Sequence, residues 1–230
     1  MRINQYLAQN NYSTRRGGDE LVSKKMVFIN DKLAKLGDQV NEGDIVEVRN
    51  APKKKYVYFA YNKPKGVVTH SAEEGDEDIA DRLENDPALK GVFPVGRLDK
   101  DSYGLIILTN DGRVTDRLLN PARVHEKQYV VKTREKLRES FKKHMEAGVQ
   151  IEDYLTKSCK IKMLGNSSFI ITLTEGKKHQ IRRMVSALHN EVLDLKRIRV
   201  MNIELGKLKA NEYRALEGEE LKTFLKSLGL

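Results

Sequence analysis

The sequence predicts an α+β chain made of a small N-terminal unit and a larger C-terminal domain. Apolar residues occur in short runs, some at strand spacing and some at helical spacing, and no segment repeats. A chain of 230 residues is long enough for one small domain joined to a larger one. A Pro- and Lys-containing stretch without apolar spacing, residues 50–56, is typical of a linker. We therefore expect domains over residues 1–49 and 57–230.

Composition narrows the function classes. Hydrophobic residues make up 39% of the chain, which is enough for a packed core. Lys and Arg exceed Asp and Glu by 42 to 33, and this excess favours a polyanionic partner, with nucleic acid ahead of a membrane surface. A basic protein without such a partner is the alternative. No apolar run approaches 18 residues and the N-terminus has no signal-peptide pattern, so we expect a cytoplasmic protein.

In chain order, the N-terminal unit begins with two predicted helices. Apolar residues at helical spacing predict the first over residues 3–10. Ser13 or Thr14 can cap the second. Because Gly17 and Gly18 each cost about 1 kcal/mol in a helix interior, we expect this helix to be short or irregular.

Short strands complete this unit. Residues 26–29 and 45–48 are apolar runs preceded or followed by turn residues, and each predicts a strand. Such a unit is too small to bury much apolar surface by itself.

The larger domain is organised around residues 96–111. A charged loop runs into the apolar residues 105–108, which predict a buried strand bounded by Gly104 and the turn 110–112. Loops held on core strands often carry reacting groups, so Asp99 is our candidate acid. A turn former or a solvated charge is the alternative interpretation of Asp99.

The remaining elements of this domain follow from the same criteria. The single cysteine, Cys159, excludes an internal disulfide and is expected to be a packed thiol. Helices are expected within 71–91 and over 113–119, 135–147 and the C-terminal segment, and strands over 57–61, 126–132, 156–163, 169–173 and 200–203.

A further helix is predicted after the glycine turn at residue 176. Ile181, Met184 and Val185 lie on one face, which we expect to be buried. At about 100° per residue, Arg182 borders that face and Arg183 points further toward solvent.

The string GRLDKDSYGLIILTND at residues 96–111 resembles the signature of the pseudouridine synthases, in the ribosomal branch of the RsuA/RluB/RluE/RluF family. The resemblance implies that Asp99 is the catalytic residue and that the larger domain is a mixed antiparallel-sheet domain. It implies that Tyr129, in Glu-Lys-x-Tyr, stacks on the target base, and that Arg182 pairs with Asp99. It also implies that Arg97 helps to open the RNA, that Leu173 is an apolar pocket wall, and that Lys63-Pro64 has a structural role.

The N-terminal unit is similar to the S4 RNA-binding domain. The matching strings are RINQYL at 2–7, TRR at 14–16, VFIN at 27–30 and GD at 43–44, with Gly17-Gly18 and Asp31 as departures. The resemblance implies phosphate contacts from the exposed cations of this unit, namely Arg2, Arg15, Arg16, Lys24 and Lys25. In the larger domain Arg183, Arg197 and Arg199 are either further phosphate contacts or surface charges.

The family resemblance implies an isomerase that converts one uridine of a structured RNA to pseudouridine. The base must be flipped out, and an ionised Asp99 acts either as a nucleophile at C1′ or as a base at C2′. We expect a monomer without metal or cofactor that acts on 23S rRNA, with tRNA or 16S rRNA as further possibilities. The competing hypotheses are a non-catalytic S4-type RNA-binding or ribosome-assembly factor and a metal-dependent nuclease using Asp99 and Asp101.

Overall fold

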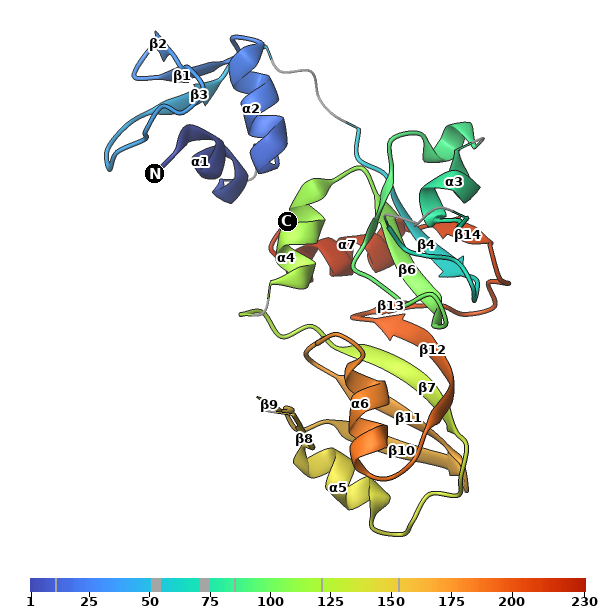
Figure 1. Cartoon of the computed structure of the whole chain (residues 1–230). Helices are drawn as coiled ribbons and strands as arrows, with labels where there is room; N and C mark the ends of the chain where they lie inside the picture. Colours follow the sequence, from blue (N-terminus) through green and yellow to red (C-terminus); the bar gives the residue numbers. More distant parts are fainter. Residues whose placement is uncertain (11, 51–54, 71–74, 85, 121, 153) are drawn as a thin grey trace.

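The computed structural model describes residues 1–230 except 11, 51–54, 71–74, 85, 121 and 153. The chain is α+β, as predicted, with a small N-terminal unit followed by a large mixed sheet (Figure 1). Most of the predicted linker, and Pro121 after the helix expected at 113–119, lie outside the described residues.

The N-terminal unit packs two helices on a three-stranded antiparallel sheet. Thr14 caps the second helix by accepting a hydrogen bond from the Gly17 amide at 3.0 Å. This helix is regular over nine residues, so the expectation of a short or irregular helix was wrong. A Cβ added to Gly18 would lie 3.2 Å from the Asn4 Cα, so the missing side chain lets the two helices approach. The elements are α1 (Ile3–Gln9), α2 (Arg15–Ser23), β1 (Val27–Ile29), β2 (Lys32–Leu33) and β3 (Val46–Val48), in sheet order β2-β1-β3.

The large sheet has the strand order β10-β11-β7-β12-β6-β4-β14, with β13 paired to β12 and β5 to β6. The β12–β6 pair is parallel and the other pairings of this sheet are antiparallel within the described residues. Its strands are β4 (Tyr58–Lys63), β5 (Phe93–Val95), β6 (Tyr103–Thr109), β7 (Lys127–Thr133), β10 (Lys160–Gly165), β11 (Ser168–Leu173), β12 (Val192–Val200), β13 (Ile203–Glu204) and β14 (Tyr213–Ala215).

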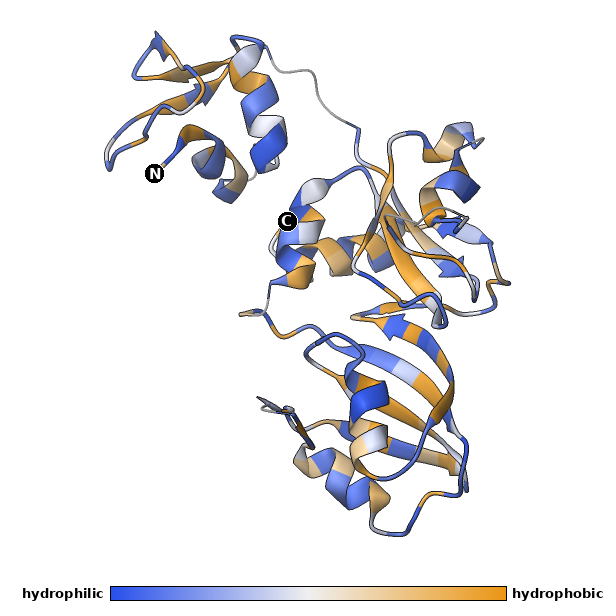
Figure 2. Ribbon diagram, viewed as in Figure 1, coloured by the Kyte–Doolittle hydropathy of each residue, from blue (hydrophilic) through white to orange (hydrophobic). Residues whose placement is uncertain are grey.

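Helices cover this sheet and divide its core into two halves. One half packs β7, β11 and β12 against α5 and α6, and the other packs β4 and β6 against α4 and α7. Strand β6 is buried on both faces, which explains its continuous apolar run, and Figure 2 shows it as largely hydrophobic. The helices are α3 (Ile79–Leu83), α4 (Gly112–Leu119), α5 (Phe141–Ala147), α6 (Gln180–Ala187) and α7 (Gly218–Leu228); a 3₁₀ turn (Pro87–Leu89) and the small hairpin of β8 (Gln150–Ile151) and β9 (Tyr154–Leu155) complete the fold.

The two halves meet where β6 runs parallel to β12. Gly104 lies opposite Arg197 and adopts φ +105°. A Cβ at Gly104 would lie 2.2 Å from the Arg197 carbonyl oxygen, so only glycine allows this approach. The loop before β6 is thereby held beside the strands of the other half.

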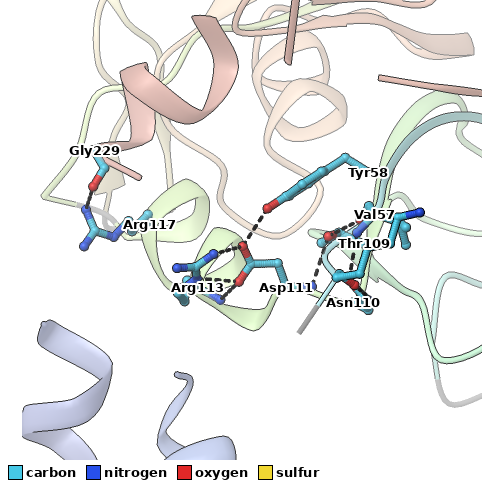
Figure 3. A network of polar contacts seen from close by, with 9 residues as sticks. Val57, Tyr58, Thr109, Asn110, Asp111, Arg113, Arg117 and Gly229 are labelled. Atoms are coloured by element: carbon cyan, nitrogen blue, oxygen red, sulfur yellow. Dashed lines mark hydrogen bonds and ion pairs between the residues drawn. The ribbon is translucent and has the colours of Figure 1, made fainter. Parts of the chain in front are cut away.

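The far end of β6 is fixed by a polar network (Figure 3). Thr109 Oγ1 donates to the Val57 carbonyl at 2.6 Å, and the Val57 amide donates to Asn110 Oδ1 at 3.0 Å. Asp111 then caps α4 and accepts hydrogen bonds from Tyr58 Oη at 2.8 Å and from the Arg113 guanidinium. These bonds join the end of β6 to the start of β4 and to α4.

Two predicted elements of this domain begin later than expected, and one strand was largely missed. The helix expected at 135–147 begins only at Phe141, because the Leu137 amide donates to the Asn166 carbonyl in the β10–β11 turn at 2.7 Å. The strand expected at 156–163 begins at Lys160, since Thr156 instead bonds to Val149 beside α5. Strand β12 was largely missed because its charged residues interrupt the apolar alternation.

Candidate active site

A cavity of about 860 Å³ lies where the two halves of the large sheet meet. Four predicted site residues line it: Arg97, Asp99, Tyr129 and Leu173. Tyr129 lies two residues after Lys127 on β7, and Leu173 lies directly opposite Lys127 on β11. Residues at this spacing share one face of a sheet, so Tyr129 and Leu173 form a common wall.

The loop that carries Asp99 has a fixed backbone. Thr69 Oγ1 donates to the Leu98 carbonyl at 2.7 Å and accepts from the Leu98 amide at 3.0 Å. The Ser102 amide donates to the Asp99 carbonyl at 3.0 Å. The Asp99 side chain stays 40% exposed within the cavity, so its carboxylate is accessible to a ligand.

His179 lies next to the Asp99 carboxylate in this structure. Its Nε2 lies 3.4 Å from Asp99 Oδ1. His179 precedes α6 and adopts φ +52°, a left-handed conformation that is uncommon for a residue with a side chain. No sequence signal pointed to this contact, because the backbone turn that produces it is not encoded by a glycine.

The expected ion pair of Arg182 with Asp99 is not among the ion pairs of the described residues. Arg182 donates instead to the Val192 carbonyl at 3.1 Å and to Ser102 Oγ at 3.4 Å. Ser102 lies three residues after Asp99, so Arg182 contacts the same loop at a different point. The physical reason is that His179, at the start of α6, reaches the carboxylate while Arg182 lies one turn further along.

Lys63 lies beneath this loop and is completely buried. Its ammonium donates to the carbonyls of Val67 at 2.5 Å and Pro64 at 3.1 Å. Burial lowers the pKa of Lys63 to about 8, although the negative charge of Asp99 acts in the opposite direction. These contacts suit the structural role that the resemblance implies for Lys63-Pro64.

Comparison with known proteins gives the family. Residues 57–187 match the model of the family described as RNA pseudouridylate synthase. The dual-specificity RNA pseudouridine synthase RluF of Escherichia coli K12 is 40% identical over 227 residues, covering 96% of this chain and 77% of that protein. The chain belongs to the RNA pseudouridylate synthase family.

Two further comparisons agree with this family assignment. The ribosomal large subunit pseudouridine synthase B of Bacillus subtilis 168 is 31% identical over 231 residues and covers 96% of this chain and 94% of that protein. A solved structure titled as a crystal structure of pseudouridylate synthase superposes with a TM-score of 0.72 at 28% identity, covering 97% of this chain and 99% of that chain. The mixed sheet is therefore the fold of this family of RNA-modifying isomerases.

As a pseudouridylate synthase, the chain carries cations outside the cavity as well as within it. The predicted phosphate contacts of the N-terminal unit, Arg2, Arg15, Arg16, Lys24 and Lys25, are all exposed, and the cavity lining does not include them. Arg183 forms an ion pair with Glu152 at 2.7 Å, and Arg199 forms one with Glu126 at 2.8 Å. Both arginines are therefore paired with a carboxylate.

Arg197 was expected to be either a further phosphate contact or a surface charge, and the surface position is wrong. It is 4% exposed, and its guanidinium donates to the Leu105 carbonyl at 2.6 Å and to the Arg97 carbonyl at 3.2 Å. The reason is its place on β12, opposite Gly104, which turns the side chain inward at the cavity floor.

Cys159 is partly buried, donates to the Met145 carbonyl, and has a pKa raised by burial to about 12. In the part of the chain that the structure describes, no three His, Cys, Asp or Glu side chains gather as a metal site. No helix of the described residues is long and apolar enough to cross a membrane.

Proposed function

We propose that this chain isomerises a specific uridine of 23S rRNA to pseudouridine in the cytoplasm, and that a tRNA is a second substrate. The observation that carries the proposal is that Asp99, Tyr129 and Leu173 line one cavity at the junction of the two half-sheets. The substrate choice is supported by the 40% identity to a relative named as dual-specific. 16S rRNA is the alternative substrate.

The reaction breaks the N1–C1′ bond of uridine and forms a C5–C1′ bond. The hydrogen on C5 leaves as a proton and N1 gains a proton, so the composition of the RNA is unchanged and no oxidant or reductant is required. In our proposal the carboxylate of Asp99 acts on the sugar, either as a nucleophile at C1′ or as a base at C2′. Both roles need an ionised and accessible side chain, and Asp99 is 40% exposed.

The target base must leave its stack to reach Asp99, at a cost of a few kcal/mol. In the proposed complex Tyr129 supplies a ring on which the extruded base stacks, and Leu173 supplies an apolar wall beside it. Both side chains lie on the face of the sheet that borders the cavity. Arg97 is exposed at the rim, where it can occupy the space that the base vacates in the RNA.

Arg182 keeps a role in this proposal through the loop. Its guanidinium contacts Ser102 Oγ, three residues after Asp99, and so it can hold the loop while the carboxylate engages the sugar. Arg182 is therefore a positioning residue.

The N-terminal unit is proposed to be an S4-type RNA-binding domain. Its two packed helices present exposed Arg15 and Arg16 at the start of α2, with Arg2 and Lys24 nearby in sequence to the two helices. Exposed cations of this kind bind RNA phosphates and strengthen binding at low salt. This unit would provide affinity, while the cavity provides the chemistry.

The test is tritium release from [5-³H]uridine-labelled 23S rRNA, 16S rRNA and tRNA, each incubated with the purified chain. We expect stoichiometric release from one position of 23S rRNA and slower release from tRNA. Release from 16S rRNA alone would overturn the substrate assignment. No release from any of the three RNAs, with tight RNA binding retained, would instead support a non-catalytic RNA-binding factor.

A further inference from the structure

Two cations at the floor of the cavity have no acidic partner. Lys127 and Arg197 both line the cavity, yet neither forms an ion pair within the described residues. Arg197 is buried and donates only to backbone carbonyls there. Buried charges in proteins are normally paired with a charge of opposite sign. Two neighbouring cations without such a partner therefore indicate a site for an anion.

The carboxylates of the cavity contact groups other than Lys127 and Arg197. Asp99 lies beside His179, and Glu175 accepts hydrogen bonds from the Tyr154 hydroxyl and from Gln180 Nε2 at 2.6 Å. Glu126, the neighbour of Lys127 in sequence, pairs with Arg199 and Lys160. None of these three carboxylates forms an ion pair with Lys127.

The strand register places both cations on the face that carries Tyr129. Lys127 is two residues from Tyr129 on β7, and Arg197 lies directly opposite Tyr129 on β12. Residues at these positions project from the same side of a sheet. A base stacked on Tyr129 would therefore bring its own backbone close to both cations.

Burial lowers the pKa of Lys127, and the positive charge of Arg197 lowers it further. The folded protein thus holds an ammonium group where its charged form is disfavoured. A bound anion would offset both effects, since it stabilises the charged ammonium and screens it from the guanidinium.

We propose that Lys127 and Arg197 form a phosphate subsite that binds a backbone phosphate flanking the flipped uridine. Lys127 acts as a point charge, and Arg197, held by its two carbonyls, directs remaining N–H groups of its fork toward the phosphate oxygens. The subsite rests on the proposed function, because it needs a nucleotide extruded onto Tyr129. It would fix the sugar relative to Asp99.

The test compares Lys127→Met with Lys132→Met, both made in an Asp99→Asn background so that RNA is bound without turnover. Lys132 is an exposed residue of the same strand, and its odd offset from Lys127 turns it to the opposite face. Affinity for the 23S rRNA fragment is measured by filter binding between about 50 and 300 mM KCl, the range in which phosphate contacts are most visible.

We expect Lys127→Met to weaken binding about tenfold, the scale of one hydrogen bond to a charged group. It should also reduce the slope of log K against log[salt] by about 0.7–1, the value for one phosphate contact. Lys127→Arg should keep the slope. Lys132→Met should have a smaller effect on affinity.

The subsite would be overturned if Lys127→Met left the slope unchanged, or if Lys132→Met had an equal effect. A fall in single-turnover rate for Lys127→Met in the Asp99 wild-type background, with affinity and slope unchanged, would assign Lys127 to the base or sugar instead. Thermal unfolding of the variants checks folding. Failure of the proposed function would appear separately, as absence of tritium release by the wild-type chain.

Discussion

Two aspartates flank strand β6, and their environments are opposite. Asp111 follows the strand, is fully buried, and accepts hydrogen bonds from Tyr58 and from the Nε and Nη2 of Arg113 at 2.8 and 2.7 Å (Figure 3). Burial, together with the hydrogen bond to Asp111, raises the pKa of Tyr58. Asp99 precedes the strand and is 40% exposed, and His179 Nε2 lies 3.4 Å from its carboxylate.

The difference separates an aspartate that stabilises the fold from one that we propose takes part in the reaction. A buried carboxylate that accepts several hydrogen bonds holds elements together and is not available to a ligand. A carboxylate on a rigid loop that keeps open acceptor positions is available for chemistry. In our proposal the same residue type is structural at one end of the strand and catalytic at the other.

The largest expected effect is on turnover and comes from a change at Asp99. Asp99→Asn removes the ionised oxygen while keeping the side-chain shape, and we expect turnover to fall at least about 10³-fold, the scale of removing a nucleophile. The midpoint of thermal unfolding and the Kd for RNA should stay near wild type, because few contacts are lost. Steady-state tritium release, a thermal melt and filter binding measure the three quantities.

Asp111→Asn should show the reverse pattern. It removes the buried negative charge that pairs with the Arg113 guanidinium, which is only 18% exposed, and we expect the free energy of unfolding to fall by about 3 kcal/mol. Turnover per folded molecule should be unchanged. Urea unfolding followed by circular dichroism gives the stability, and Asp116→Asn, an exposed position of the same helix, is the control. Equal unfolding curves for the two variants would contradict the structural role of Asp111.

Lys63 tests whether a buried charge beneath the loop that carries Asp99 reduces the free energy of unfolding. Its pKa is about 8 in the folded chain and 10.5 as the ordinary value, so the unfolded state binds more protons between these pH values. Stability must therefore rise with pH in this window. Relative to Lys63→Met, the unfolding free energy of the wild type should increase by about 2 kcal/mol from pH 7 to 9.5. Urea titrations at both pH values measure it, and a constant difference would contradict the assignment.

The smallest expected effect concerns His179. Asn tolerates the left-handed backbone at this position, whereas its shorter side chain does not reach Asp99. We expect His179→Asn to reduce kcat by about three- to tenfold. This is the effect expected from the loss of one exposed contact worth about 1 kcal/mol. KM and thermal stability should be nearly unchanged. A larger change in KM than in kcat would assign His179 to RNA binding.

The helices and strands that could be predicted from the sequence are those whose spacing of apolar residues matches the faces that the fold buries. The apolar run at 105–108 became the central strand because it is buried on both faces, and Thr14 capped α2 because its side chain bonds locally. Asp99, Tyr129 and Leu173 could be placed in one cavity from family motifs, and the structure brings them to it. Their catalytic roles stay predictions.

The contacts that were missed depend on long-range packing. Arg197 was expected to be a phosphate contact or a surface charge, but the approach of β12 to Gly104 buries it, and nothing in the local string of charged residues indicates that approach. Arg182 was expected to reach Asp99, but the backbone turn at His179 set a different partner. Periodicity gives the face of a helix, whereas partners across the cavity depend on where the two half-sheets meet.

The most direct test of the central claim is single-turnover tritium release with enzyme in excess over 23S rRNA, because the rate then reports chemistry without product release. Asp99→Asn is compared with Asp101→Asn, an exposed acid two residues further along the same loop. Our account predicts a loss of at least about 10³-fold for Asp99→Asn and less than about threefold for Asp101→Asn. Wild-type rates for Asp99→Asn would contradict it.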